Sequence, residues 1–255
     1  MNTQIGPLLK SITTLFPSSH YALLSLFLFI GLELLFVIHR WLFLLFFIFL
    51  AILIIGIFLI RSEEGEQFHP TQTILPGLAA FGFGALAIYL PLTSFLHIYF
   101  LVCAILFFFI LKHGAKQAYP TWNMVISPAV LFTVIAPAIG WRFTLYTPVW
   151  VMLAILFPII VLIAFQSLLR YTKTLGEAGM IALSLGFVLT EITWILQFLP
   201  LHFIVQAGLI VAIYHTIVQL SILTIEKNLT KRTILEYSLA GAGALLILGI
   251  TAHWS

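Results

Sequence analysis

Charged residues are scarce in this sequence. Asp, Glu, Lys and Arg make up 7% of its 255 residues, whereas hydrophobic residues make up 62% and the mean hydropathy is +1.18. Because a water-soluble domain carries about 25% charged residues, this composition excludes one of this size. The single cysteine, Cys103, excludes an intrachain disulfide and a metal site built from several cysteines. The polar gaps are all short, so any chemistry must take place in or at a membrane.

The sequence lacks the residues that several recognisable kinds of active or cofactor site need. The apolar runs hold no Lys for a retinal Schiff base, and the chain has neither a Gly-x-Ser-x-Gly nucleophile turn nor a His-Glu-x-x-His zinc pair. The histidines form no obvious set of paired haem ligands. The net charge of +3 is not gathered into a basic cluster. We therefore predict no metal, no cofactor and no nucleic-acid partner.

Long apolar runs fill most of the chain. A helix needs about 20 apolar residues to cross a hydrocarbon core of roughly 30 Å. Continuous hydrophobicity favours helices over barrel strands, which would alternate polar and apolar residues. We predict an all-α, polytopic transmembrane helical bundle of about nine spans. They lie at about 20–39, 41–60, 74–92, 94–111, 122–139, 148–169, 177–198, 202–225 and 234–252.

The runs 20–39 and 41–60 are separated by very few residues. One helix from 20 to 60 would be roughly 60 Å long, about twice the core thickness, so we interpret them as a tight hairpin. Residues 1–19 precede the first span and carry apolar residues at helical spacing with one Lys. We expect this segment to be cytoplasmic, lying at the membrane interface or as a tail. Residues 20–255 are expected to form one transmembrane domain.

The basic residues alternate between the gaps. With nine spans, one face receives nine of the eleven Lys and Arg residues, and the other face receives only Arg40 and Arg142. The positive-inside rule then predicts a cytoplasmic N-terminus, an external C-terminus and a multi-pass protein of the cell membrane, with a bacterial or archaeal plasma membrane favoured. The nine residues assigned to the inside are Lys10, Arg61, Lys112, Lys116, Arg170, Lys173, Lys227, Lys231 and Arg232.

Two carboxylates, Glu33 and Glu191, lie inside predicted spans. Because an ionised group in hydrocarbon costs a few kcal/mol, each marks a candidate site. Both are placed roughly 10–12 Å below the outer surface, at matching depth. Other polar or aromatic residues gather near that level and suggest an outward-facing polar pocket with Arg40 and Arg142 above it as candidate anion or headgroup contacts. These other residues are His97, Trp194, Gln197, His202 and Gln206.

A second polar pair, His215 and Gln219, lies nearer the cytoplasm at i, i+4 spacing. Such a pair either extends a path inward or ties neighbouring helices together, and for the glutamines the tie is the commoner case. Small residues gather at 238–249 in the last span, where helix backbones can approach closely. We expect membrane lipids as partners, and a second copy or another membrane subunit at this small-residue face.

Three functions fit these features. The first is a small transporter or permease-like protein in which Glu33 and Glu191 share protons or bind a cation. The second is an outer-leaflet lipid-processing enzyme, in which Arg142 or Arg40 holds a headgroup and Glu191 or a His acts as acid or base. The third is an accessory subunit without chemistry of its own. Adjacent first and seventh spans with facing Glu side chains would favour one shared site.

Overall fold

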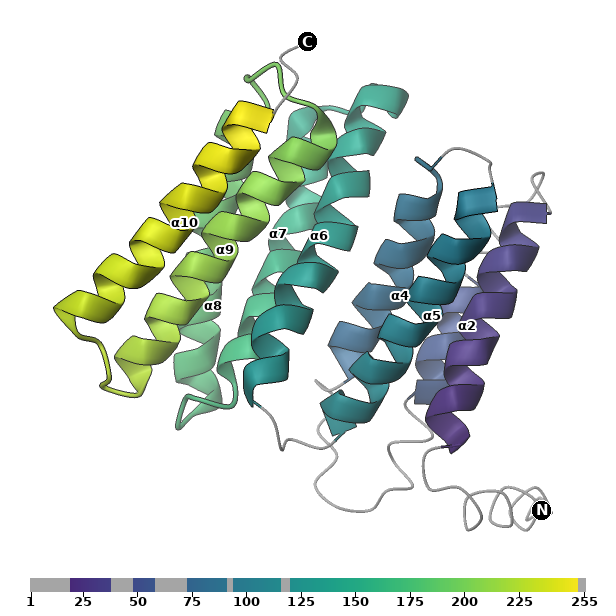
Figure 1. Ribbon diagram of the computed structural model, residues 1–255, viewed down its shortest axis with the longest axis horizontal. Coiled ribbons are helices and arrows are strands. Elements are labelled where there is room, and N and C mark those ends of the chain that lie inside the picture. Colours follow the sequence, from purple (N-terminus) through teal and green to yellow (C-terminus); the bar gives the residue numbers. More distant parts are fainter. Residues whose placement is uncertain (1–18, 38–47, 58–72, 91–93, 116–119, 252–255) are drawn as a thin grey trace. The chain divides into compact units, whose positions relative to one another are not determined.

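The computed structural model describes residues 19–37, 48–57, 73–90, 94–115 and 120–251 (Figure 1). Its regular secondary structure in these ranges is helical, which confirms the all-α prediction. Contacts between Cα atoms divide the chain into two compact units, Met1–Tyr119 and Pro120–Ser255. Each unit is described by itself. Arg40 and the predicted segment 1–19, apart from Ser19, lie outside the described residues.

The first unit contains α2 (Ser19–Val37), a short helix at Ile48–Ile57, α4 (Ile74–Ala87) and α5 (Ser94–Ala115). Gly31 of α2 lies against the ring of Phe49, and Gly56 lies near Leu24. A late position of the first helix therefore meets an early position of the second, so the two helices pack antiparallel. This arrangement agrees with the predicted break between the first two runs, because a single continuous helix cannot pack against itself.

The described part of the second unit, residues 120–251, contains five helices that run alternately in opposite directions (Figure 1). Helix α7 packs on α8 and α6, and α9 packs on α6, α8 and α10. The core between them is mainly aliphatic, with Tyr214 fully buried in it and a few buried polar side chains. The helices are α6 (Pro120–Leu145), α7 (Val149–Leu168), α8 (Leu175–Leu196), α9 (Phe203–Ile225) and α10 (Lys231–Thr251).

Local signals set the helix ends of the second unit. Thr174 precedes α8, and its hydroxyl accepts a hydrogen bond from the backbone N–H of Glu177 at 3.2 Å, which is an N-cap. At the end of α9, Lys227 adopts a left-handed φ of 58°. The N–H of Asn228 then donates to the carbonyl of Leu223, which closes α9 with a Schellman motif built on Lys instead of Gly.

Among the described residues, six helices are long and apolar enough to cross a membrane: Phe95–Lys112, Met124–Leu145, Val149–Leu168, Leu175–Leu196, Phe203–Ile225 and Lys231–Ile250. They correspond to the last six predicted spans. Shorter apolar helices at His20–Leu34, Ile48–Ile57 and Ile74–Ala87 lie within the first three. The architecture therefore fits a multi-pass integral membrane protein, whereas the count of nine spans and the orientation stay predictions.

The small residues of α10 divide between two environments. A Cβ on Gly241 would lie 2.5 Å from Thr216 Oγ1, so this glycine packs closely on α9. At Gly243 and Gly249 a Cβ would meet open space. Part of the small-residue face is therefore used inside the unit, and part of it is left uncovered by the described residues.

Candidate functional site

Glu33 and His97 form a hydrogen-bonded pair between α2 and α5. Nδ1 of His97 lies 2.8 Å from Oε1 and 3.0 Å from Oε2 of Glu33. Glu33 lies four residues before the end of α2, and His97 lies three residues after the start of α5. Both groups are therefore within about 6 Å of helix ends, at 1.5 Å per residue. Two residues predicted from depth alone to share a site are in direct contact.

The pair lies on the accessible side of the first unit. The His97 side chain is 67% exposed and the Glu33 side chain is 25% exposed. The neighbouring residues Leu32 and Leu96 are buried and fix the two helices against their unit. Two proton-binding groups, a carboxylate and an imidazole, therefore lie within hydrogen-bond distance, and packing holds them in place. The imidazole remains exposed at the surface of the unit.

A second polar group lies where α6, α8 and α9 meet. Nη1 of Arg142 donates to Oε1 of Gln197 at 2.5 Å, and Nε2 of Gln197 donates to Oε1 of Gln206 at 2.8 Å. Nε2 of Gln206 in turn donates to the backbone carbonyl of Leu201 at 2.9 Å. The three predicted residues are thus joined in one chain of hydrogen bonds. Since each link ties helices or their connection together, the chain has the arrangement of an interhelical tether.

His202 and Trp194 lie at helix ends of the same unit. Nδ1 of His202 accepts a hydrogen bond from the N–H of Ile204 at 3.4 Å and caps α9. Trp194 is 49% exposed, and its ring meets the edge of Phe198. Both residues therefore have local structural contacts, and a role in a pocket stays a prediction for them.

Glu191 lies on the outer face of α8. Leu189 and Thr193 are fully buried two residues to either side, so Glu191 points about 200° away from the face that packs on the unit. Its side chain is exposed, and no residue in the described ranges forms a hydrogen bond or ion pair with it. Glu33 and Glu191 belong to different units. Their meeting in one site stays a prediction.

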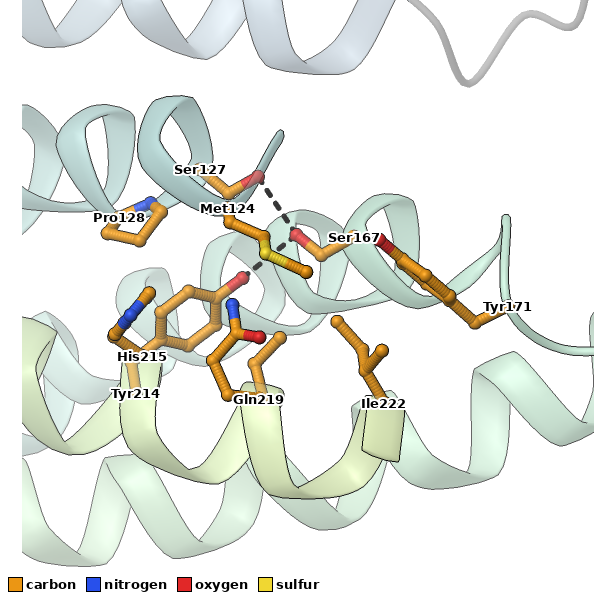
Figure 2. A pocket seen from close by; sticks show the side chains of 10 residues that line it. Met124, Ser127, Pro128, Ser167, Tyr171, Tyr214, His215, Gln219 and Ile222 are labelled. Atoms are coloured by element: carbon orange, nitrogen blue, oxygen red, sulfur yellow. Dashed lines mark hydrogen bonds between the residues drawn. The ribbon is translucent and has the colours of Figure 1, made fainter. Parts of the chain in front are cut away.

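The inner pair, His215 and Gln219, lines a pocket between α6, α7 and α9 (Figure 2). The pocket is partly open, and its volume of about 10 Å³ gives room for about one water molecule. A buried cluster of three hydroxyls, from Ser127, Ser167 and Tyr214, faces the same space. Sequence reasoning missed this cluster. The signal was Tyr214, an aromatic with a polar tip in the middle of a span instead of at its end.

No protein family, no curated protein and no solved structure matches the chain. The class of the protein therefore follows from its own helices: the part of the chain that the structure describes is all-helical and fits a multi-pass integral membrane protein. Its candidate sites are the Glu33 and His97 pair in the first unit and the pocket at His215 and Gln219 in the second.

Proposed function

We propose that the protein is a small transporter, permease-like in character, whose outer half holds a proton-binding site with Glu33 and His97 at its centre. The observation that carries the proposal is the contact between both carboxylate oxygens of Glu33 and Nδ1 of His97 across two apolar helices. Proton-binding groups inside spans commonly mark ion or substrate paths. The reason is that an ionisable group in hydrocarbon costs free energy, so such groups are rare where they have no function.

A change of protonation alters how the pair tolerates its apolar surroundings. With one proton shared between carboxylate and imidazole, the pair has no net charge. Gain or loss of a proton leaves one net charge, which costs a few kcal/mol in hydrocarbon. Since that cost depends on the position of α2 and α5 relative to water, proton binding favours one helix arrangement over another. His97 lies three residues after the start of α5, and this place near a helix end supports proton access from the membrane surface.

The proposal includes Glu191 as a second carboxylate of the same site and a partner helix at the uncovered part of α10. The exposed face that carries Glu191 supports the first, because an unpaired carboxylate on a span needs a polar neighbour. Open space at Gly243 and Gly249 supports the second. A monomeric mass for the detergent-solubilised protein would count against the partner. The lipid-enzyme alternative has weaker support, because Arg142 is already bound to Gln197.

Currents driven by a pH step test the transporter proposal. The protein is reconstituted in liposomes on a supported membrane, and a step from mildly alkaline to mildly acidic pH is expected to displace charge as the pair takes up protons. Glu33→Gln should remove most of the displaced charge, because the amide of glutamine does not take up a proton in this pH range and the pair is lost. Glu236→Gln is the matched control, because Glu236 pairs with Arg232 on another helix.

Equal displaced charge in Glu33→Gln and in the unmodified protein would contradict the proposal, as would a signal no larger than that of empty liposomes. Glu191→Gln in the same assay tests the wider site. If the two carboxylates share protons, this variant loses as much as Glu33→Gln does. Displaced charge that is unchanged by Glu191→Gln would confine the site to Glu33 and His97.

A further inference from the structure

The pocket between α6, α7 and α9 has the size of one water molecule. Its volume of about 10 Å³ is close to the least that can hold a single water, and a larger molecule does not fit. The pocket is partly open, so water can enter it. Tyr171 lines it from the connection after α7, whereas His215 lines it from ten residues before the end of α9. The pocket therefore lies between a histidine in mid-span and the end of the unit.

Gln219 points into this pocket without a partner from the chain. It is 3% exposed, and it makes no hydrogen bond with any residue in the part of the chain that the structure describes. Figure 2 shows its carboxamide directed into the pocket, beside the ring of Tyr214 and opposite Ser167. Leaving a buried carboxamide unpaired costs free energy, and ordered water is the usual partner where the chain supplies none.

His215 lines the same pocket one helical turn before Gln219. It is half-buried, and within the described ranges no residue forms a hydrogen bond or ion pair with it. Side chains at i, i+4 on a helix have Cβ atoms about 5–6 Å apart. Since one water molecule can make two hydrogen bonds of about 2.8 Å each, it can join an imidazole nitrogen to a carboxamide at this spacing.

Helix α6 places a backbone acceptor beside the pocket. Pro128 lies inside α6 and has no N–H, so the carbonyl of Met124, four residues earlier, loses its usual helical hydrogen bond. Met124 and Pro128 both line the pocket. A water molecule there therefore has a carbonyl oxygen within the same wall to which it can donate.

Three hydroxyls add further polar surface. Oγ of Ser167 lies 3.0 Å from Oγ of Ser127 and 3.0 Å from Oη of Tyr214, and all three residues line the pocket. Each hydroxyl oxygen has two lone pairs, so the cluster keeps acceptors beyond its internal hydrogen bonds. A buried water typically makes about three hydrogen bonds, and this lining offers at least that many partners.

His215 is the group in this lining that is suited to exchange a proton near neutral pH. The ten described lining residues include no Asp, Glu, Lys or Arg, and the other titratable groups are the phenols of Tyr171 and Tyr214. Phenols ordinarily keep their proton at neutral pH, whereas imidazoles gain and lose one there. Helices α8 and α10 also pack on α9 but contribute no lining residue.

We infer that one water molecule binds in this pocket, bridging His215 and Gln219, and that it lets His215 exchange protons with the surrounding water from within a span. The bridge adds little net stability, because its hydrogen bonds are offset by the entropy that the bound water loses. The inference goes beyond the proposed proton site and uses only residues of the second unit, so either can fail while the other holds.

Deuterium uptake at Cε1 of each histidine ring tests the inference. The full chain is incubated in heavy water in detergent micelles, and its peptides are weighed by mass spectrometry. His215 is expected to take up deuterium, and exposed His202 serves as the reference in the same unit. Gln219→Met keeps the side-chain length and removes the amide. It should slow uptake at His215 by about three- to tenfold, the factor that one hydrogen bond of ordinary strength produces, and leave His202 unchanged.

Gln219→Leu, which differs from methionine in shape, should slow uptake at His215 as well. Ser221→Ala is the matched control on the same helix, because the Ser221 hydroxyl bonds its own helix at Ile217 and does not line the pocket. It should leave uptake at His215 unchanged. Uptake at His202 without uptake at His215 in the unmodified protein would overturn the inference, because water would then not reach the pocket. Uptake at His215 that neither Gln219 variant slows would overturn it as well.

Discussion

Replacing Gly186 with alanine is expected to destabilise the second unit by about 1–3 kcal/mol, although alanine favours helix formation. A Cβ at this position of α8 would meet the side chain of Val161 on α7, in close contact, and the ring of Phe157 at 3.3 Å. Val161 is β-branched and has one strongly preferred rotamer in a helix, so it cannot move aside cheaply. The two helices must separate to admit the extra atom.

Gly179→Ala is the matched control, on the same helix. A Cβ at Gly179 meets nothing within 4 Å, so only the conformational effect remains. This variant should be stabilised by about 0.5–1 kcal/mol. The free energy of unfolding can be measured for both by titrating the micellar protein with SDS and following far-UV circular dichroism. Changes of the same sign and size in the two variants would show that α7 and α8 do not approach closely at Gly186.

Gln206→Met is expected to cost about 1–3 kcal/mol of unfolding free energy, whereas Gln219→Met should cost little or even stabilise. Both glutamines are buried on α9. Gln206 accepts a hydrogen bond from Gln197 and donates one to the Leu201 carbonyl. Its replacement therefore leaves the Gln197 amide and the Leu201 carbonyl without these hydrogen-bond partners. Gln219 has no hydrogen-bond partner among the described residues, so no group loses a partner when it is replaced. Methionine also removes an unpaired amide from the interior.

The same SDS titration compares the two glutamine variants directly, since they share residue type, helix and substitution. Equal losses would mean that burial alone sets the cost and that the hydrogen-bond chain from Arg142 to Leu201 contributes nothing. A large loss in Gln219→Met alone would mean that the Gln219 amide already forms hydrogen bonds in the folded protein.

Average hydropathy located the helices of the second unit. A helix surrounded by lipid and other helices is apolar on all sides, so it can be found without a periodic pattern of apolar and polar residues. The predicted spans 148–169 and 202–225 differ from α7 and α9 by one residue at each end or less. Helix α6 runs on to Leu145, beyond the end of the predicted span 122–139. Its extension carries Arg142, a residue that normally ends a span, and the contact with Gln197 provides the polar partner that the sequence did not reveal.

Depth along a helix was predictable, but the direction of a side chain around the helix was not. Glu33 and His97 came out at one level from the rise per residue alone, and they are in contact. Glu191 came out at the same level, yet it points away from the face that packs on its own unit. These helices are apolar almost all round, so no hydrophobic stripe marks the inner face. Ser127 and Ser167 were missed for a related reason, since serine is too common in spans to stand out.

The displaced charge after a pH step, measured for a double-mutant cycle of Glu33→Gln and His97→Asn, tests the proposed proton site most directly. If the two side chains bind protons as one unit, each single variant and the double variant should leave the same small residual charge, because removal of either partner already disables the pair. If the double variant instead loses about the sum of the two single losses, the groups act independently and the proposed site is wrong.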